Sequence, residues 1–241
     1  MKYRLQKLYA YLIHIFTSLG AVLGVLSLVA ISKHQYELAF LYIAISIIVD
    51  AVDGSLARVV DIKALAKIDG ALLDNIIDFL NYAVVPAYFI MIAQANGSVP
   101  HHWKIPCMIL IIMAACYQFT QVDAKTDDHF FKGFPSYWNI VIFYLFYWQL
   151  HPVTNVFIIV ILTIFSFIPI KYIYPSRMTH LSKNKYLVTL MFTATIIWGI
   201  ATILLLFTYP KQQLILNGIC IGYILLYFVV SVYRTFKPLK L

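Results

Sequence analysis

Long apolar stretches separated by short polar segments run through almost the whole chain. Most of them approach or exceed the roughly 20 residues that an α-helix needs to cross a bilayer. The fifth stretch is short, so seven spans remain possible, but we predict eight. The pattern therefore predicts an all-α, polytopic integral membrane bundle, one domain over residues 1–241, with about eight transmembrane helices. These helices are expected over residues 8–32, 36–57, 70–94, 105–122, 137–150, 152–170, 186–209 and 212–233.

The positions of the basic residues give this bundle an orientation. With eight spans and the N-terminus inside, the cytosolic segments hold 15 of the 18 Lys and Arg residues, and the outer segments hold only Lys33, Lys104 and Lys211. This split follows the positive-inside rule and places both termini in the cytosol. The net charge of +8 is therefore mostly topology, and no nucleic-acid motif accompanies it.

Four aspartates interrupt the second and third apolar stretches, at Asp50, Asp53, Asp74 and Asp78. An Asp at the centre of a span costs about 2.5 to 3.5 kcal/mol on insertion scales, so each of them needs a partner. Residues three or four apart share one helix face, and the short connection makes the two helices antiparallel neighbours. We therefore expect four carboxylates to converge between them, open to the cytosol.

Carboxylate oxygens are hard ligands that suit Mg²⁺, Mn²⁺ or Ca²⁺. Four of them exceed what one Mg²⁺ usually takes from protein, so a two-metal site of the kind used in phosphoryl transfer is plausible. Gly54, Ala57 and Gly70 remove side-chain bulk beside the acids, so a ligand can approach the backbone. Arg58 can pair with an acid or hold a phosphate.

The pattern Asp50-x2-Asp53-Gly54-x2-Ala57-Arg58 … Gly70-x3-Asp74-x3-Asp78 resembles the signature of the CDP-alcohol phosphotransferases. These enzymes exchange the nucleotide of a CDP-activated molecule for an alcohol and release CMP. The resemblance, with its motif core at 50–78, implies two ions of Mn²⁺ or Mg²⁺ held by the four acids, with Asp78 also the general base. It further implies nucleotide and phosphate binding at Gly54, Ala57, Arg58 and Gly70.

The spacer between Arg58 and Gly70 has eleven residues where eight are usual, which is similar to the bacterial phosphatidylcholine synthase branch of this family. Further segments share that similarity, at 78–82, 86–88, 123–127, 133–139 and 169–177. The resemblance implies that CDP-diacylglycerol and choline react to give phosphatidylcholine and CMP. It also implies a homodimer among the lipids of the bacterial inner membrane, with its site facing the cytosol.

The acceptor is the less direct inference. A quaternary ammonium is bound by aromatic faces, and the candidates near the motif helices or the cytosolic ends are Tyr82, Tyr88, Tyr117, Tyr137 and Trp138. A phosphorylated acceptor would instead need a basic cluster. Lys125, Lys132, Lys171 and Arg177 leave that alternative open for glycerol phosphate or inositol phosphate. Within the family, another acceptor (serine, inositol or glycerol phosphate) is the alternative to choline. A cation-coupled transporter would show symmetry-related broken helices, and no second half repeats the Asp motif.

Overall fold

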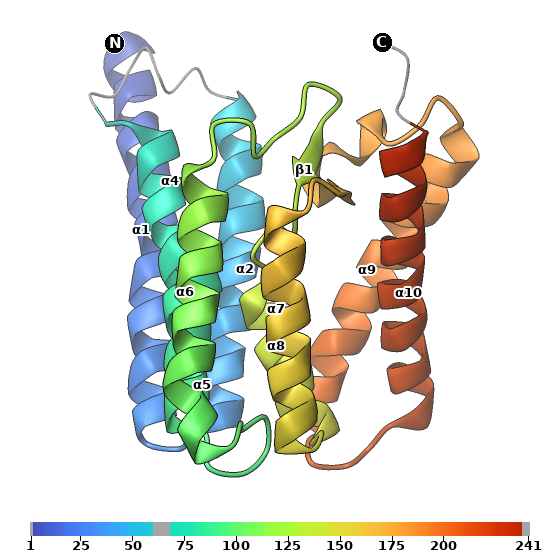
Figure 1. Ribbon diagram of the computed structural model, residues 1–241. Coiled ribbons are helices and arrows are strands. Elements are labelled where there is room, and N and C mark those ends of the chain that lie inside the picture. The colour runs from blue at the N-terminus through green and yellow to red at the C-terminus, as the bar shows by residue number, and fades with distance from the viewer. Residues whose placement is uncertain (1, 60–67, 238–241) are drawn as a thin grey trace.

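Helices that run side by side along one common direction form almost the whole structure, which is a computed structural model (Figure 1). It describes residues 2–59 and 68–237, with side chains for 7–54, 68–175 and 177–237. The long helices are α1 (Lys2–Ser32), α2 (Tyr36–Val59), α4 (Gly70–Phe79), α5 (Val85–Ile92), α6 (Lys104–Thr120), α7 (Trp138–Trp148), α8 (Pro152–Phe167), α9 (Lys185–Thr208) and α10 (Leu214–Phe236). Short 3₁₀ turns occur at His101–Trp103 (η2) and Pro175–His180 (η3).

The described chain contains five segments long and apolar enough to cross a membrane, so it is a multi-pass membrane protein. They are Lys7–Ser32, Gly70–Ile92, His101–Thr120, Lys185–Thr208 and Leu214–Phe236. Helix α2 has 24 residues and carries two of the acids, whereas α7 and α8 are shorter apolar helices of 11 and 16 residues. The all-α membrane bundle is confirmed, and the count of eight spans stays a prediction.

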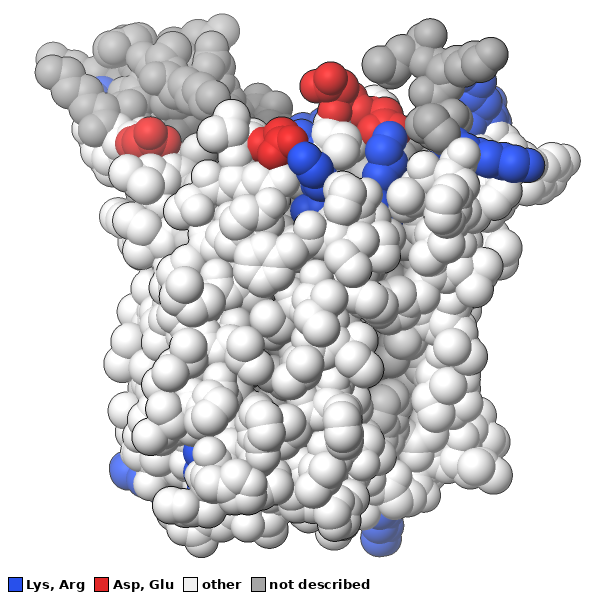
Figure 2. Space-filling view, viewed as in Figure 1, with Lys and Arg blue, Asp and Glu red and all other residues white. Residues whose placement is uncertain are grey.

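Charged side chains gather at one end of the bundle (Figure 2). Helix α1 begins and helix α10 ends at this same end (Figure 1), as an even number of crossings requires. Elsewhere the visible surface is almost free of charge, because α1, α9 and α10 turn large apolar side chains outward, among them Ile15, Phe192 and Leu225. Such a surface suits lipid tails rather than water.

Helices α4 and α5 are joined by a π-helical turn (η1, Leu80–Val84), so that Gly70–Ile92 forms one continuous rod. Asn81 in this turn is buried, and its Nδ2 donates to the backbone oxygen of Gly20 in α1 at 3.0 Å. The approach of α1 is close, because a Cβ at Gly24 would lie 2.5 Å from Oδ1 of Asn81. The π turn is thereby fixed against α1 one turn beyond Asp78.

A small two-stranded ribbon, absent from the sequence prediction, lies at the charged end. Strand β1 (Phe130–Lys132) pairs antiparallel with β2 (Lys171–Ile173). The ribbon is tied to α10, because the backbone N–H of Lys171 donates to the Thr235 hydroxyl at 2.8 Å. The Tyr227 hydroxyl likewise donates to the oxygen of Ile173 at 3.0 Å. The ribbon therefore joins the loop after α6 to the last helix.

Gly133 connects this ribbon to the end of α8. Its backbone φ is +79°, and its N–H donates to the oxygen of Ile170 at 2.9 Å. A Cβ added at Gly133 would lie only 2.4 Å from the backbone oxygen of Ser166. No side chain fits this position, since both the backbone conformation and the neighbouring carbonyl oppose it.

We expect Gly133→Ala to destabilise the protein by at least about 1–3 kcal/mol, the range for a non-glycine residue held in a strained backbone conformation. The measurement is thermal unfolding in detergent. Gly199→Ala in α9 is the matched control, because a Cβ there meets no atom of the described residues within 4 Å. Alanine is also the better helix former by about 1 kcal/mol, so this control should be neutral or stabilising. Equal unfolding temperatures for both variants would contradict the analysis.

Candidate active site

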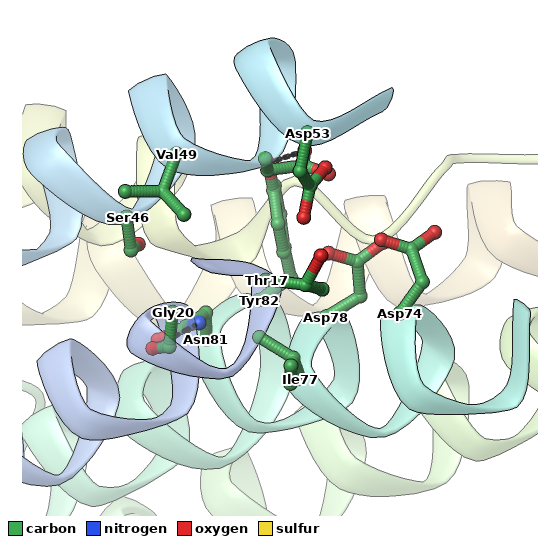
Figure 3. A pocket seen from close by; sticks show the side chains of 11 residues that line it. Thr17, Gly20, Ser46, Val49, Asp53, Asp74, Ile77, Asp78, Asn81 and Tyr82 are labelled. Atoms are coloured by element: carbon green, nitrogen blue, oxygen red, sulfur yellow. Dashed lines mark hydrogen bonds between the residues drawn. The ribbon is translucent and has the colours of Figure 1, made fainter. Parts of the chain in front are cut away.

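Three of the four predicted aspartates converge between α2 and α4. Asp50, Asp74 and Asp78 each offer a carboxylate oxygen, and these atoms lie within 4.8 Å of one another. Asp74 and Asp78 point from α4 toward α2 (Figure 3). Helices α2 and α4 both pack against α1. The helix pair that was predicted to hold the acids therefore packs against a third helix, α1, for which the sequence analysis predicted no part in the site.

Asp53 lines the same cavity but lies outside the group of three. It is only 4% exposed, and its carboxylate interacts with the Thr17 hydroxyl of α1 and with the backbone N–H of Gly54. Figure 3 shows Asp53 on α2 facing the α4 acids. The structure thus brings all four predicted acids to one cavity, where oxygens of three lie within 4.8 Å of one another and the fourth acid lies against α1.

The cavity also has walls that sequence reasoning missed. Beside the four acids it is lined by Thr17, Gly20, Ser46, Val49, Ile77, Asn81 and Tyr82. Thr17, Ser46 and Asn81 are polar residues within apolar stretches. Polar side chains inside spans face the interior of a bundle rather than lipid, and this signal could have found them.

The two glycines of the motif have different surroundings. A Cβ at Gly54 would meet no atom of the described residues within 4 Å, so the space beside this residue is open on their side. A Cβ at Gly70 would lie 2.7 Å from Cε1 of His14, so this space is filled by the buried ring of His14 in α1. A ligand could therefore approach Gly54, whereas the space beside Gly70 is filled by the His14 side chain of α1. The side chains of Ala57 and Arg58 lie outside the described residues.

The predicted aromatic residues separate into two groups. The Tyr82 hydroxyl donates to Oδ2 of Asp50 at 3.3 Å, and the Tyr137 ring lies 6.3 Å from the Tyr82 ring. Both side chains are half-buried. Of the five candidates only Tyr82 lines the acidic cavity that the described residues form, and Tyr137 lies behind it. The other three lie elsewhere: Trp138 is fully buried against Phe134, Tyr117 lies against Phe167 in a tilted ring pair, and Tyr88 packs against the apolar core.

The four acids lack bonded cations of their own. Within the described residues no Lys or Arg forms an ion pair with any of them. Among the described residues, the ammonium of Lys125 interacts electrostatically with Asp50, Asp74 and Asp78. Three hard oxygen donors within 4.8 Å, without a salt-bridge partner in the described chain, fit the coordination chemistry of a divalent metal ion.

Two lysines of the β1–β2 ribbon are paired with carboxylates outside the acidic cavity. Lys132 forms an ion pair with Asp123, and Lys171 with Asp128 at 2.6 Å. Burial alone raises the pKa of Asp128, but hydrogen bonds from Lys171 and Thr126 outweigh it and hold that pKa below its usual value. The hydrogen bond from Lys132 likewise lowers the pKa of Asp123. Both carboxylates are therefore ionised at neutral pH and neutralise these two lysines.

Comparison with known proteins places the acidic motif in a family. Residues 11–168 match the family described as CDP-alcohol phosphatidyltransferase. A phosphatidylcholine synthase of Legionella pneumophila is 42% identical over 231 residues, which cover 95% of this chain and 90% of the relative. The phosphatidylcholine synthase of Legionella bozemanae is 44% identical over 219 residues, which cover 90% of this chain and 100% of the relative. The phosphatidylcholine synthase of Borreliella burgdorferi is 38% identical over 183 residues, which cover 76% of this chain and 77% of the relative. The chain therefore belongs to the CDP-alcohol phosphatidyltransferase family.

Proposed function

We propose that this protein is a phosphatidylcholine synthase, which transfers the phosphatidyl group of CDP-diacylglycerol to choline and releases CMP. One observation carries the proposal: Asp50, Asp74 and Asp78 converge in a chain that is 42% identical, over 95% of its length, to a protein with that activity. The surroundings of the acids fit the reaction, because the apolar surface of the bundle suits a diacylglycerol anchored in the membrane.

In the reaction, the choline hydroxyl oxygen attacks the phosphorus that carries diacylglycerol. The bond from this phosphorus to the oxygen bridging to CMP breaks, and CMP leaves with the electron pair. An aliphatic hydroxyl is a weak nucleophile at neutral pH and needs a nearby base. Asp78 takes the hydroxyl proton, since it is half-buried in the cavity beside Asp50 and Asp74.

Asp50, Asp53, Asp74 and Asp78 would hold the divalent metal, and we infer two ions of Mn²⁺ or Mg²⁺. Bound there, such ions would neutralise the pyrophosphate and stabilise the oxygen of the departing CMP. The open side of Gly54 admits the cytidine. We propose that Ala57 and Arg58 complete the nucleotide and phosphate contacts. Gly70 then acts indirectly, because it seats His14 at the start of α4.

The acceptor follows from the charges around the site. A phosphorylated acceptor such as glycerol phosphate would need several free cations. Of the four basic residues predicted for that role, Lys132 and Lys171 are already bound to carboxylates. Tyr82, bonded to Asp50, and the neighbouring Tyr137 instead offer aromatic faces, as a quaternary ammonium requires. We favour these two over Tyr88, Tyr117 and Trp138.

We further propose eight spans in the bacterial inner membrane, with the charged end and the acids toward the cytosol, and a homodimer. The orientation is supported by the charges at the end where α1 begins (Figure 2), since cytosolic ends carry the excess of Lys and Arg. The acids lie toward that same end, because Asp74 follows the start of α4 by only one turn.

An acceptor screen tests the function. Purified protein would receive CDP-diacylglycerol and Mn²⁺ or Mg²⁺ with choline, serine, inositol or glycerol 3-phosphate, and both CMP and the lipid product would be measured. We expect phosphatidylcholine from choline alone. Asp78→Asn should lower the rate by about 10²–10⁴-fold, the usual contribution of a general base. Glu37→Gln, at the exposed opposite end of α2, should leave it unchanged. Product from another acceptor would keep the family chemistry and exclude choline.

The two glycines should respond differently to substitution. Gly54→Val should raise the KM for CDP-diacylglycerol by more than about tenfold, or 1.4 kcal/mol, with little change in unfolding temperature, because it fills open space. Gly70→Ala should lower the unfolding temperature, because its Cβ displaces the His14 ring. Steady-state kinetics and thermal unfolding in detergent check both. The same pattern of effects in the two variants would show that the glycines have one common role.

A further inference from the structure

Four aromatic rings form a continuous row from the acids toward the charged end of the bundle. The Tyr82 ring lies 6.3 Å from Tyr137, and Tyr137 meets Phe131 edge-to-face, also at 6.3 Å. Phe131 in turn lies 4.3 Å from the ring of Tyr174. All four side chains are half-buried, so each keeps part of its surface accessible. We call this row the aromatic track.

The inner end of the track is next to the carboxylates. Tyr82 donates its hydroxyl hydrogen to Asp50 at 3.3 Å, and its ring stands in the electrostatic field of Asp50 and Asp78. Tyr137 stands in the field of the same two acids. A cation on these rings would therefore be attracted both by the aromatic faces and by nearby negative charge.

The outer end of the track already carries a cation. The Lys125 ammonium lies 5.5 Å from the centroid of the Tyr174 ring, within the range of a cation–π interaction. The backbone of Lys125 is bridged to Phe131, which keeps this lysine beside the track. Unlike Lys132 and Lys171, Lys125 forms no ion pair within the described part of the chain. Its charge instead interacts with Asp50, Asp74 and Asp78.

We propose that the aromatic track is the approach path and binding site of the acceptor's trimethylammonium group, and that Lys125 occupies its outer end in the free protein. This inference rests on the proposed function, because it takes choline as the acceptor. A trimethylammonium group donates no conventional hydrogen bond, so it is selected by ring faces and a diffuse negative field, and the track supplies both. Phe131 and Tyr174 thereby become specificity-determining residues that the sequence analysis did not single out.

The test is steady-state kinetics, varying choline and CDP-diacylglycerol separately. Tyr174→Leu should raise the KM for choline by about two- to fivefold, the size of one exposed cation–π contact, and leave the KM for CDP-diacylglycerol unchanged. Tyr174→Phe should behave as wild type, because the ring face and not the hydroxyl is used. Tyr186→Leu at the start of α9 is the matched control, since this tyrosine is exposed and has no described ring contact with the track.

Lys125→Met supplies a second test that does not depend on packing, because Lys125 is exposed. It should lower the KM for choline by about two- to fivefold, since a competing cation is removed, whereas Lys125→Arg should keep the wild-type value. An unchanged KM for choline in Tyr174→Leu and Lys125→Met would overturn the aromatic track while wild-type synthesis from choline upheld the proposed function. Failure of the wild-type protein to use choline would reject the proposed function itself.

Discussion

Carboxylates placed inside a membrane bundle are the constraint on which the rest of this structure depends. Asp50, Asp74 and Asp78 are partly buried and hold oxygens within 4.8 Å of one another, where their charges repel. Such an arrangement is costly unless a cation is bound, and a divalent ion offers the largest compensation. Helix α1 supports it from below: Thr17 interacts with Asp53, and the oxygen of Gly20 fixes the π turn beyond Asp78.

The lysines of the β1–β2 ribbon form salt bridges outside the acidic site. Lys132 and Lys171 pair with Asp123 and Asp128, not with any of the four acids. Their positions follow from the ribbon, where the two lysines are cross-strand partners tied to α10 through Thr235. Within the described residues the acids are therefore free of salt bridges, as the proposed binding of metal and substrate requires.

Much of this arrangement could be predicted from the sequence, because the length of an apolar stretch predicts a helix and three- or four-residue spacing predicts a shared face. The role of α1 could not, since nothing in the spacing of His14 or Thr17 shows which helix they meet. The ribbon was also missed, because three-residue strands depend on partners about forty residues away rather than on local pattern. The pairing of Lys171 with Asp128 was hidden for the same reason, as was the π turn at Asn81.

The most direct measurement is the binding of Mn²⁺ to purified protein, followed by thermal unfolding in detergent with and without the ion. A site built from Asp50, Asp74 and Asp78 predicts a rise in unfolding temperature with Mn²⁺ that chelation reverses, because a ligand of the folded state stabilises it. The rise should disappear in Asp50→Asn and Asp74→Asn, and persist in Glu37→Gln. An unfolding temperature that is unaffected by Mn²⁺ and Mg²⁺ in the wild-type protein would contradict the account.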